Sequence, residues 1–252
     1  MTNNLNKKLI ERYSRQIVIK DIGVVGQKKI INSKVLIIGA GGLGCYVLDS
    51  LSRAGVGKIG IADFDKVNLS NIHRQSLYNS KDVGKNKVSV IKKKIKIINP
   101  HIKIEIYNKK ITEKNIKKII TKYDIIVDGS DNFKTKFLLN EYSIKYKKIL
   151  IVGAISKMDG HIFTFDFKNK NNPCLKCFYQ SEPSDEVLNC EFEGILGPVA
   201  GIVGNIQATE ILKKILNLSE KSNKKILILD LLNLNFRKAE FNKKKNCVCK
   251  NF

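Results

Sequence analysis

The chain has 252 residues, of which 43% are hydrophobic, enough for one large α/β domain or two small ones with a packed core. The formal net charge is +23, yet only five of the 46 basic residues are arginines, and lysines are spread along the chain among Ile and Asn. We therefore expect lysines to cover solvated surfaces, which attract acidic protein partners, and we expect no dedicated nucleic-acid stripe. No apolar run approaches the roughly 18 residues of a membrane span, and residues 1–8 lack the apolar centre of a signal peptide. These features predict a cytoplasmic protein without a membrane partner.

The first part of the chain alternates short apolar runs with segments of helical spacing. Such alternation predicts a mostly parallel sheet with helices on both faces, joined by right-handed crossovers. A helical segment over 5–33 precedes it. We expect buried strands at 35–39, 58–62, 102–107, 124–128 and 149–152, and helices at 42–54, 83–98, 113–121 and 133–146.

The pattern changes after Gly153. Residues 160–167 alternate and carry aromatic side chains, which predicts antiparallel strands. A long helix is expected over 197–216 and a strand over 225–230. We expect a single domain, with N-terminal helices in 1–33, a nucleotide-binding half in 34–153 and a mixed half in 154–252.

The glycine-rich segment between the first strand and its helix contains Gly39, Gly41, Gly42 and Gly44. Glycines here permit a tight turn and a close backbone approach, so that N–H groups at the helix start can face a phosphate. Asp63 ends the next strand, about twenty residues on, where a carboxylate can hold ribose hydroxyls. Together these features predict a nucleotide site.

Charged residues near this segment argue against the default choice, a hydride-transferring NAD or FAD enzyme. Arg74 and Lys87 follow the second strand, and Asp131 follows a later strand, where it could hold Mg²⁺. Arg15 adds a guanidinium suited to a triphosphate. Each residue taken singly could instead form a surface salt bridge, but the conjunction of all four with the glycine segment makes that alternative poor.

At this point the chain resembles the ThiF/MoeB/HesA family of ubiquitin-activating-enzyme-like adenylyltransferases, which includes the molybdopterin-synthase and ThiS adenylyltransferases. The resemblance covers nearly the whole chain, and its ordered set of motifs is specific to the family but not to a subfamily. The motifs lie at 12–16, 39–44, 63–65, 69–75, 84–87, 128–132, 173–177 and 194–198.

The resemblance implies a Rossmann-like fold whose C-terminal half binds the carrier and is held by a cysteine zinc site. It also implies ATP- and Mg²⁺-dependent adenylation of the C-terminal glycine of a small ubiquitin-like sulfur carrier, with release of pyrophosphate. Gly42 would approach the phosphates, Asp63 the ribose and Asp131 the metal. Asn71, Arg74 and Lys87 would hold the triphosphate, and in a homodimer Arg15 would reach into the partner subunit's site. The expected cofactor-binding set is Gly39, Gly41, Gly42, Gly44, Asp63, Asp65, Ser70, Asn71, Arg74, Gln75, Lys87, Asp131 and Asn132.

This chemistry requires no general base, because the attacking α-carboxylate has a reference pKa of about 3.5 and is already ionised at neutral pH. Catalysis is then positioning and charge neutralisation around the α-phosphate. We expect the product to serve molybdopterin or thiamine biosynthesis. Because no sulfurtransferase-like segment follows the last cysteines, we expect a separate protein to donate the sulfur.

Cysteines form the last set of candidate residues. Cys174 and Cys177, beside Cys247 and Cys249, resemble the structural zinc site of the family, except that Cys247-Val248-Cys249 is one residue shorter than the usual spacing. A four-cysteine zinc site is the leading interpretation, and a partial or lost site is the alternative. Cys190, in a polar segment, is a candidate for sulfur transfer or covalent carrier attachment, or else a buried small side chain.

Three other functions remain open. A relative in the same superfamily adenylates and dehydrates a carboxylate on modified tRNA, which would suit the positive charge but not the cysteine pairs. An NAD- or FAD-linked oxidoreductase would show no ATP–pyrophosphate exchange. A zinc-stapled, inactive nucleotide-binding scaffold should lack Arg74, Lys87 or Asp131, and this chain keeps all three.

Overall fold

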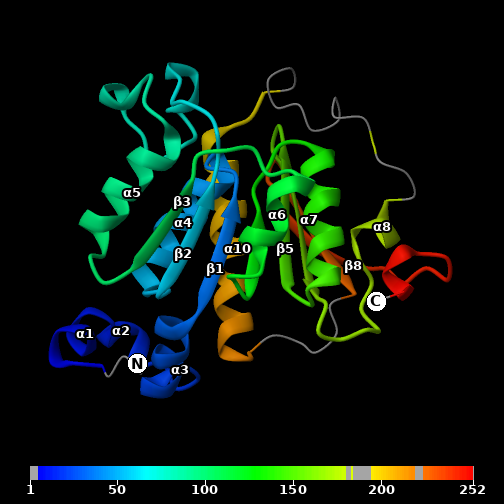
Figure 1. The fold of residues 1–252 in the computed structure, drawn as a ribbon, viewed down its shortest axis with the longest axis horizontal. Helices are drawn as coiled ribbons and strands as arrows, with labels where there is room; N and C mark the ends of the chain where they lie inside the picture. The colour runs from blue at the N-terminus through cyan, green and yellow to red at the C-terminus, as the bar shows by residue number, and fades with distance from the viewer. Residues whose placement is uncertain (1–4, 180–182, 184–193, 219–223, 252) are drawn as a thin grey trace.

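The computed structural model describes residues 5–179, 183, 194–218 and 224–251 (Figure 1). Its helices and strands follow in the order α1 (Lys7–Arg12), α2 (Ser14–Ile17), α3 (Gly23–Asn32), β1 (Lys34–Ile38), α4 (Gly42–Ala54), β2 (Lys58–Ala62), α5 (Lys87–Ile98), β3 (Lys103–Tyr107), α6 (Glu113–Ile120), β4 (Ile125–Asp128), α7 (Phe133–Lys145), β5 (Ile149–Ser156), β6 (Asp159–Asp166), α8 (Leu175–Phe178), α10 (Gly197–Leu216), β7 (Lys225–Asp230) and β8 (Asn235–Glu240). Short 3₁₀ turns occupy Leu69–Asn71, Ser80–Asp82 and Val248–Asn251.

One sheet runs through both halves of the chain, with strand order β3-β2-β1-β4-β5-β6-β7-β8. The first five strands are parallel, and β6, β7 and β8 are antiparallel to their neighbours. The predicted parallel sheet with an antiparallel continuation is therefore confirmed. The order also makes β1 and β4, which are distant in the sequence, parallel neighbours at the point where the strand order reverses. In α/β proteins, ligands bind at the carboxyl ends of the strands at such a point.

The sheet is buried on both faces, which explains its uninterrupted apolar strands. In β1, Val35 and Ile37 pack into a core with α4, α5 and α10, whereas Leu36 and Ile38 pack into a second core with α6, α7 and α8. Figure 1 shows α6 and α7 on the face toward the viewer and α10 behind the sheet. Because a strand alternates its side chains between faces, a strand covered on both sides must be apolar throughout.

Three details of the predicted elements are wrong. Residues 5–33 form three helices, because the chain bends at Tyr13 and again before Gly23, whose φ of 55° is left-handed. The helix expected from residue 83 begins at Lys87, because Gly84 at φ 82° turns the chain before it. Strand β8 was not predicted, because its exposed, charged sequence lacks an apolar face.

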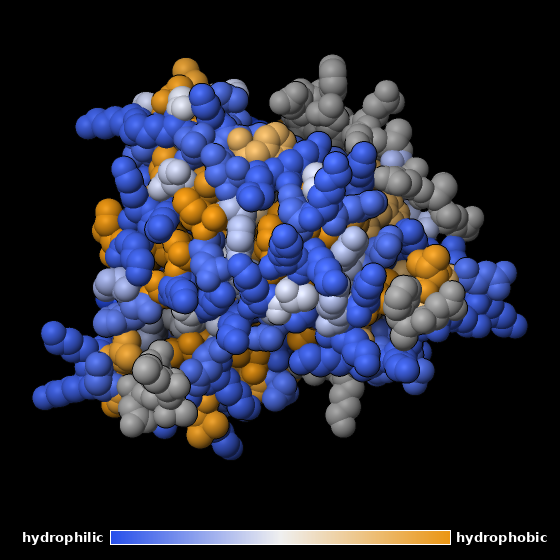
Figure 2. Space-filling view, viewed as in Figure 1, coloured by the Kyte–Doolittle hydropathy of each residue, from blue (hydrophilic) through white to orange (hydrophobic). Residues whose placement is uncertain are grey.

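Polar and charged side chains cover most of the face in Figure 2, with hydrophobic ones scattered between them. This agrees with lysines that decorate solvated surfaces. The described part of the chain contains no helix that combines the length and the hydropathy of a membrane span.

Candidate nucleotide-binding site

A cavity of about 330 Å³ opens at the carboxyl ends of the parallel strands. The loops that follow β1, β2, β3 and β4 each contribute to its lining, because parallel strands bring their carboxyl ends to one edge of the sheet. Residues distant in the sequence meet there: Gly41 after β1, Asp63 after β2, Lys109 after β3 and Asp131 after β4. The predicted residues that line it are Gly39, Gly41, Gly42, Asp63, Asp65, Asn71, Arg74, Gln75, Lys87, Asp131 and Asn132.

The glycine segment packs too closely for any larger residue at two positions. Gly39 has a φ of 94°, and a Cβ on it would lie 2.6 Å from the carbonyl oxygen of Gly129. A Cβ on Gly44 would lie 1.9 Å from the carbonyl oxygen of Gly39. Gly44 is therefore a packing residue that does not line the cavity, and Gly42 starts α4 at its edge. The N-terminus of this 13-residue helix adds backbone N–H groups and a favourable dipole for an anion.

Asp63 organises this segment as well as facing the cavity. Its Oδ2 accepts a hydrogen bond from the backbone N–H of Ala40 at 2.7 Å, and its Oδ1 accepts one from the N–H of Asp65 at 2.8 Å. Burial raises the pKa of Asp63, while Lys87 and these two N–H groups oppose that rise. Each carboxylate oxygen keeps a second acceptor site, so a ribose hydroxyl can still be bound.

Cationic groups lie beside the glycine segment. The buried ammonium of Lys87 donates to Oδ2 of Asp65 at 2.9 Å. The guanidinium of Arg74 donates to the carbonyl of Ser70 at 2.9 Å, and its remaining donors can serve a ligand. Ser70 itself does not line the cavity. Gln75 does, and its buried Oε1, which has no partner within the described part of the chain, can accept a hydrogen bond from a ligand.

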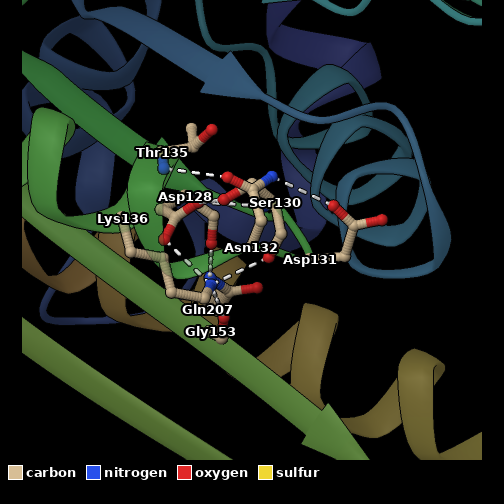
Figure 3. Close-up of polar contacts among 8 residues, drawn as sticks. All are labelled: Asp128, Ser130, Asp131, Asn132, Thr135, Lys136, Gly153 and Gln207. Carbon is tan, nitrogen blue, oxygen red and sulfur yellow. Dashed lines mark hydrogen bonds and ion pairs between the residues drawn. The ribbon is translucent and has the colours of Figure 1, made fainter. Parts of the chain in front are cut away.

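The loop after β4 is held by a buried lysine that sequence reasoning missed (Figure 3). Lys136 donates to Oδ2 of Asp128 at 2.9 Å and to the carbonyls of Ser130 and Gly153, each at 2.8 Å. Asp128 and Lys136 are 0% and 2% exposed, so this is a fully buried ion pair with every ammonium proton used. Gln207 of α10 donates to the carbonyl of Asp128 at 3.0 Å. These bonds present the exposed Asp131 carboxylate to the cavity.

Lys109 and Lys110 also line the cavity without having been predicted. Lys110 lies over the ring of Phe64, with its ammonium 5.8 Å from the ring centroid. Both lysines follow the carboxyl end of β3, so the rule that selected Asp63 and Asp131 would have found them had it been applied to the third strand.

Arg15 lies away from the cavity of its own chain. The N-terminal helices pack where β2 and β3 begin: Tyr13 accepts a hydrogen bond from Asn99 at 2.8 Å, and Gln16 donates to the carbonyl of Ala54 at 3.3 Å. Ala54 and Asn99 lie shortly before β2 and β3, at the amino ends of the parallel strands and therefore opposite the cavity. Arg15 is exposed there.

The four predicted metal ligands come together in space. The Sγ atoms of Cys174, Cys177, Cys247 and Cys249 all lie within 4.8 Å of one another. Individual Sγ–Sγ distances are 3.4 Å for Cys174 and Cys247, 3.6 Å for Cys177 and Cys249, and 3.9 Å for Cys174 and Cys177. A zinc ion with Zn–S bonds of about 2.3 Å sets tetrahedral sulfurs about 3.8 Å apart. The donor set and spacing therefore fit zinc, and the short 247–249 spacer does not keep either cysteine out.

One thiolate is already favoured in the cluster. The hydrogen bond from Cys174 lowers the pKa of Cys177 to about 4. Because thiolates are the form that binds metal, this electrostatic arrangement suits a cation. Cys45, by contrast, is buried behind the glycine segment, and burial raises its pKa to about 12, as expected for a packing residue. Cys190 lies outside the described residues.

Comparison with known proteins assigns the family. The ThiF family profile matches residues 13–251. The chain belongs to the ThiF family. This ThiF-family chain is 36% identical over 248 residues to a sulfur carrier protein adenylyltransferase of Thermus thermophilus, covering 96% of this chain and 92% of that protein.

Three further proteins extend the comparison. The chain is 38% identical over 244 residues to the adenylyltransferase and sulfurtransferase MOCS3 of Aedes aegypti, covering 96% of this chain but only 55% of the relative, about half its length. A probable molybdopterin-synthase adenylyltransferase of Gracilaria tenuistipitata is 36% identical over 244 residues, covering 97% and 68%. Escherichia coli MccB, solved with ATP, superimposes with a TM-score of 0.82 at 24% identity, covering 96% of this chain and 75% of MccB, which shows a shared fold.

Proposed function

We propose that this protein uses ATP to adenylate the C-terminal carboxylate of a small ubiquitin-like sulfur carrier, with release of pyrophosphate. The observation that carries the proposal is the meeting of Arg74, Lys87 and Asp131 around the glycine segment in one cavity. Hydride transfer does not call for a metal-binding carboxylate beside the phosphates, whereas phosphate activation needs both cations and such a carboxylate. The names of the relatives favour a sulfur carrier over a modified tRNA as the substrate.

The positions of the side chains support the role proposed for each residue. The N-terminus of α4 and the guanidinium of Arg74 neutralise phosphate charge as it develops, and Asp63 holds the ribose. Asp131 and the neighbouring Asn132 would hold Mg²⁺, which supplies charge neutralisation on the phosphates. Lys87, fixed by Asp65, keeps an ammonium beside them. The carrier carboxylate is ionised at neutral pH, so these residues have only to align it with the α-phosphate and exclude water.

The decisive experiment is carrier-dependent exchange of labelled pyrophosphate into ATP. Arg74→Ala and Asp131→Ala should each lower the exchange rate by about 100-fold or more, the size of effect seen when one stabilising charge is removed. Arg53→Ala is the matched control, because Arg53 is exposed on α4 and pairs with Asp49 outside the cavity. Exchange at the wild-type rate in either cavity variant would refute the proposal.

The partners belong to the same proposal. We infer a homodimer in which Arg15 of one subunit completes the site of the other, since Arg15 cannot serve the cavity of its own chain. Arg15→Ala should then lose activity and regain it when mixed with the Arg74→Ala variant, because a mixed dimer holds one intact site.

A separate protein would donate the sulfur, in the cytoplasm, and Cys190 would take part in sulfur transfer or in covalent attachment of the carrier. A thiol-sensitive carrier adduct that persists in Cys190→Ala would exclude that role.

Zinc at the four cysteines is proposed as a structural element. The geometry of the four Sγ atoms supports it. Protein purified without chelator should contain about one zinc per chain, as a closed four-thiolate site requires. Well under one zinc per chain, with no other metal bound, would count against the site.

A further inference from the structure

Helix α7 contacts the loop of the nucleotide cavity at one end and the cysteine cluster further along. At its start, Oδ1 of Asn132 accepts a hydrogen bond from the N–H of Thr135 at 2.9 Å, and Lys136 binds Asp128, Ser130 and Gly153. One turn later, Oδ1 of Asn140 accepts a hydrogen bond from the backbone N–H of Leu175 at 2.9 Å. The same helix therefore holds two segments that bear different candidate sites.

The Asn140 bond is buried and directed at the metal-binding turn. Leu175 lies between Cys174 and Cys177 and opens α8, and both Asn140 and Leu175 are 0% exposed. Loss of the amide oxygen would leave a buried N–H without a partner, which is costly because water cannot replace it. The amide Nδ2 of Asn140 has no partner among the described residues, so the side chain serves chiefly as an acceptor for this one N–H.

Aromatic contacts strengthen the connection. The rings of Phe133 and Phe137 on α7 lie 5.2 Å and 6.3 Å from the ring of Tyr179, which follows α8, in edge-to-face arrangements. The ammonium of Lys176, between the two cysteines of the turn, lies 5.9 Å from the ring of Phe137. A displacement of α8 would therefore displace α7 as well.

We propose that Asn140 is a positioning residue that couples metal binding at the cysteine cluster to nucleotide binding in the cavity. A metal at the cluster fixes the 174–177 turn to the 247–249 segment, so Leu175 holds α7 in place. Lys136, four residues before Asn140, then holds the loop that carries Asp131. The inference rests on the proposed function only in taking ATP as the ligand of the cavity.

The coupling has a thermodynamic signature. If metal binding tightens nucleotide binding by a given factor, nucleotide must tighten metal binding by the same factor, and couplings between sites are typically about 5- to 150-fold. A purely structural metal would raise the stability of the fold and leave the nucleotide dissociation constant of the folded protein unchanged. The nucleotide dissociation constant of metal-free protein divided by that of metal-loaded protein therefore distinguishes a coupling metal from a purely structural one.

The experiment measures the dissociation constant of a non-hydrolysable ATP analogue by calorimetry, with zinc-loaded and chelator-stripped protein. Wild type should bind the analogue at least about fivefold more tightly when zinc is loaded. In Asn140→Ala this ratio should fall to one. Ser143→Ala is the matched control, because Ser143 lies one turn further on α7, is equally buried and has a hydroxyl with no partner in the described part of the chain.

A reciprocal measurement covers the case in which stripped protein or a variant unfolds. Zinc-loaded wild type is titrated with a chelator of known affinity, with and without the analogue, and nucleotide should strengthen zinc retention by the same factor. A ratio of one in wild type, or an undiminished ratio in Asn140→Ala, would overturn the coupling. Wild type that binds no analogue at all would instead contradict the proposed function.

Discussion

Replacing Lys136 with methionine would test whether the buried ion pair supports the loop of the nucleotide cavity. Methionine keeps most of the volume of the lysine side chain and removes its charge. The variant leaves the fully buried carboxylate of Asp128 without its cation, and the carbonyls of Ser130 and Gly153 lose their donor. Oδ1 of Asp128 keeps its bonds from the N–H and hydroxyl of Ser130, at 2.9 and 2.6 Å.

Removing one partner of a buried ion pair typically costs about 3–5 kcal/mol, because the other charge stays buried without compensation. For a chain of this size, 1 kcal/mol shifts the unfolding temperature by about 2–4 °C, so the expected loss is about 6–20 °C. Adding Asp128→Asn to Lys136→Met removes the stranded charge. The double variant should therefore be more stable than the single one.

Urea and thermal unfolding give the stability, and titration with an ATP analogue gives the affinity, which should fall as the Asp131 loop loosens. Lys134→Met is the control: Lys134 is an exposed lysine on the same helix, and its loss should change stability by less than about 0.5 kcal/mol. A loss below about 1 kcal/mol in Lys136→Met, or a double variant less stable than the single one, would refute the reasoning.

Two other predictions concern the sheet and the glycine segment. The carboxylate of Glu105 pairs with Lys58 and accepts hydrogen bonds from Tyr107 and Tyr123. Burial alone would raise the pKa of Glu105, but these contacts, Lys58 first among them, lower it from an ordinary 4.5 to about 2. Since the folded state binds the proton more weakly, this carboxylate stabilises the fold above about pH 4.5 and loses that effect as the pH falls toward 2. Glu105→Gln should therefore unfold at lower urea than wild type at pH 7, with a gap that narrows on acidification; a constant gap would contradict the assignment. Gly44→Ala places a Cβ 1.9 Å from the carbonyl oxygen of Gly39, so it should weaken ATP-analogue binding about tenfold or more. Gly84→Ala has no atom near its Cβ, so it should lower the free energy of unfolding by only about 1–2 kcal/mol, the cost of a left-handed backbone, and leave ATP-analogue binding unchanged. Equal affinity of the two variants would show that the glycine segment does not shape the cavity.

Much of the fold could be predicted because its strands are buried on two faces. A continuous apolar run such as residues 35–38 is typical of a strand covered on both faces, and the glycines after it mark the turn into α4. Strand β8 gives no such signal, since its stability comes from pairing with β7 and its side chains face solvent. The three N-terminal helices share one apolar periodicity, and only tertiary contacts such as Tyr13 with Asn99 decide where the chain bends.

The lining of the cavity was predictable wherever its residues follow a parallel strand, as Asp63 and Asp131 do. Lys136 was missed because it is one lysine among many in a lysine-rich chain, and nothing in the local sequence separates a buried ammonium from a solvated one. For the cysteine cluster, the geometry and not the choice of residues was hard to predict. Its residues were evident, but whether the short 247–249 spacer could close the cluster depended on the backbone geometry of the tail.

The cysteine cluster also has a consequence for how the chain is made. Cys174 and Cys247 are 73 residues apart, and the second pair follows every strand of the described sheet. During translation, the strands and the glycine segment emerge from the ribosome and can pair first, because domains form from their N-terminal parts as they are synthesised. The nascent protein therefore carries an open thiol pair at 174–177 until residues 247–249 have been synthesised. The proposed metal could have all four cysteine ligands only from that moment on.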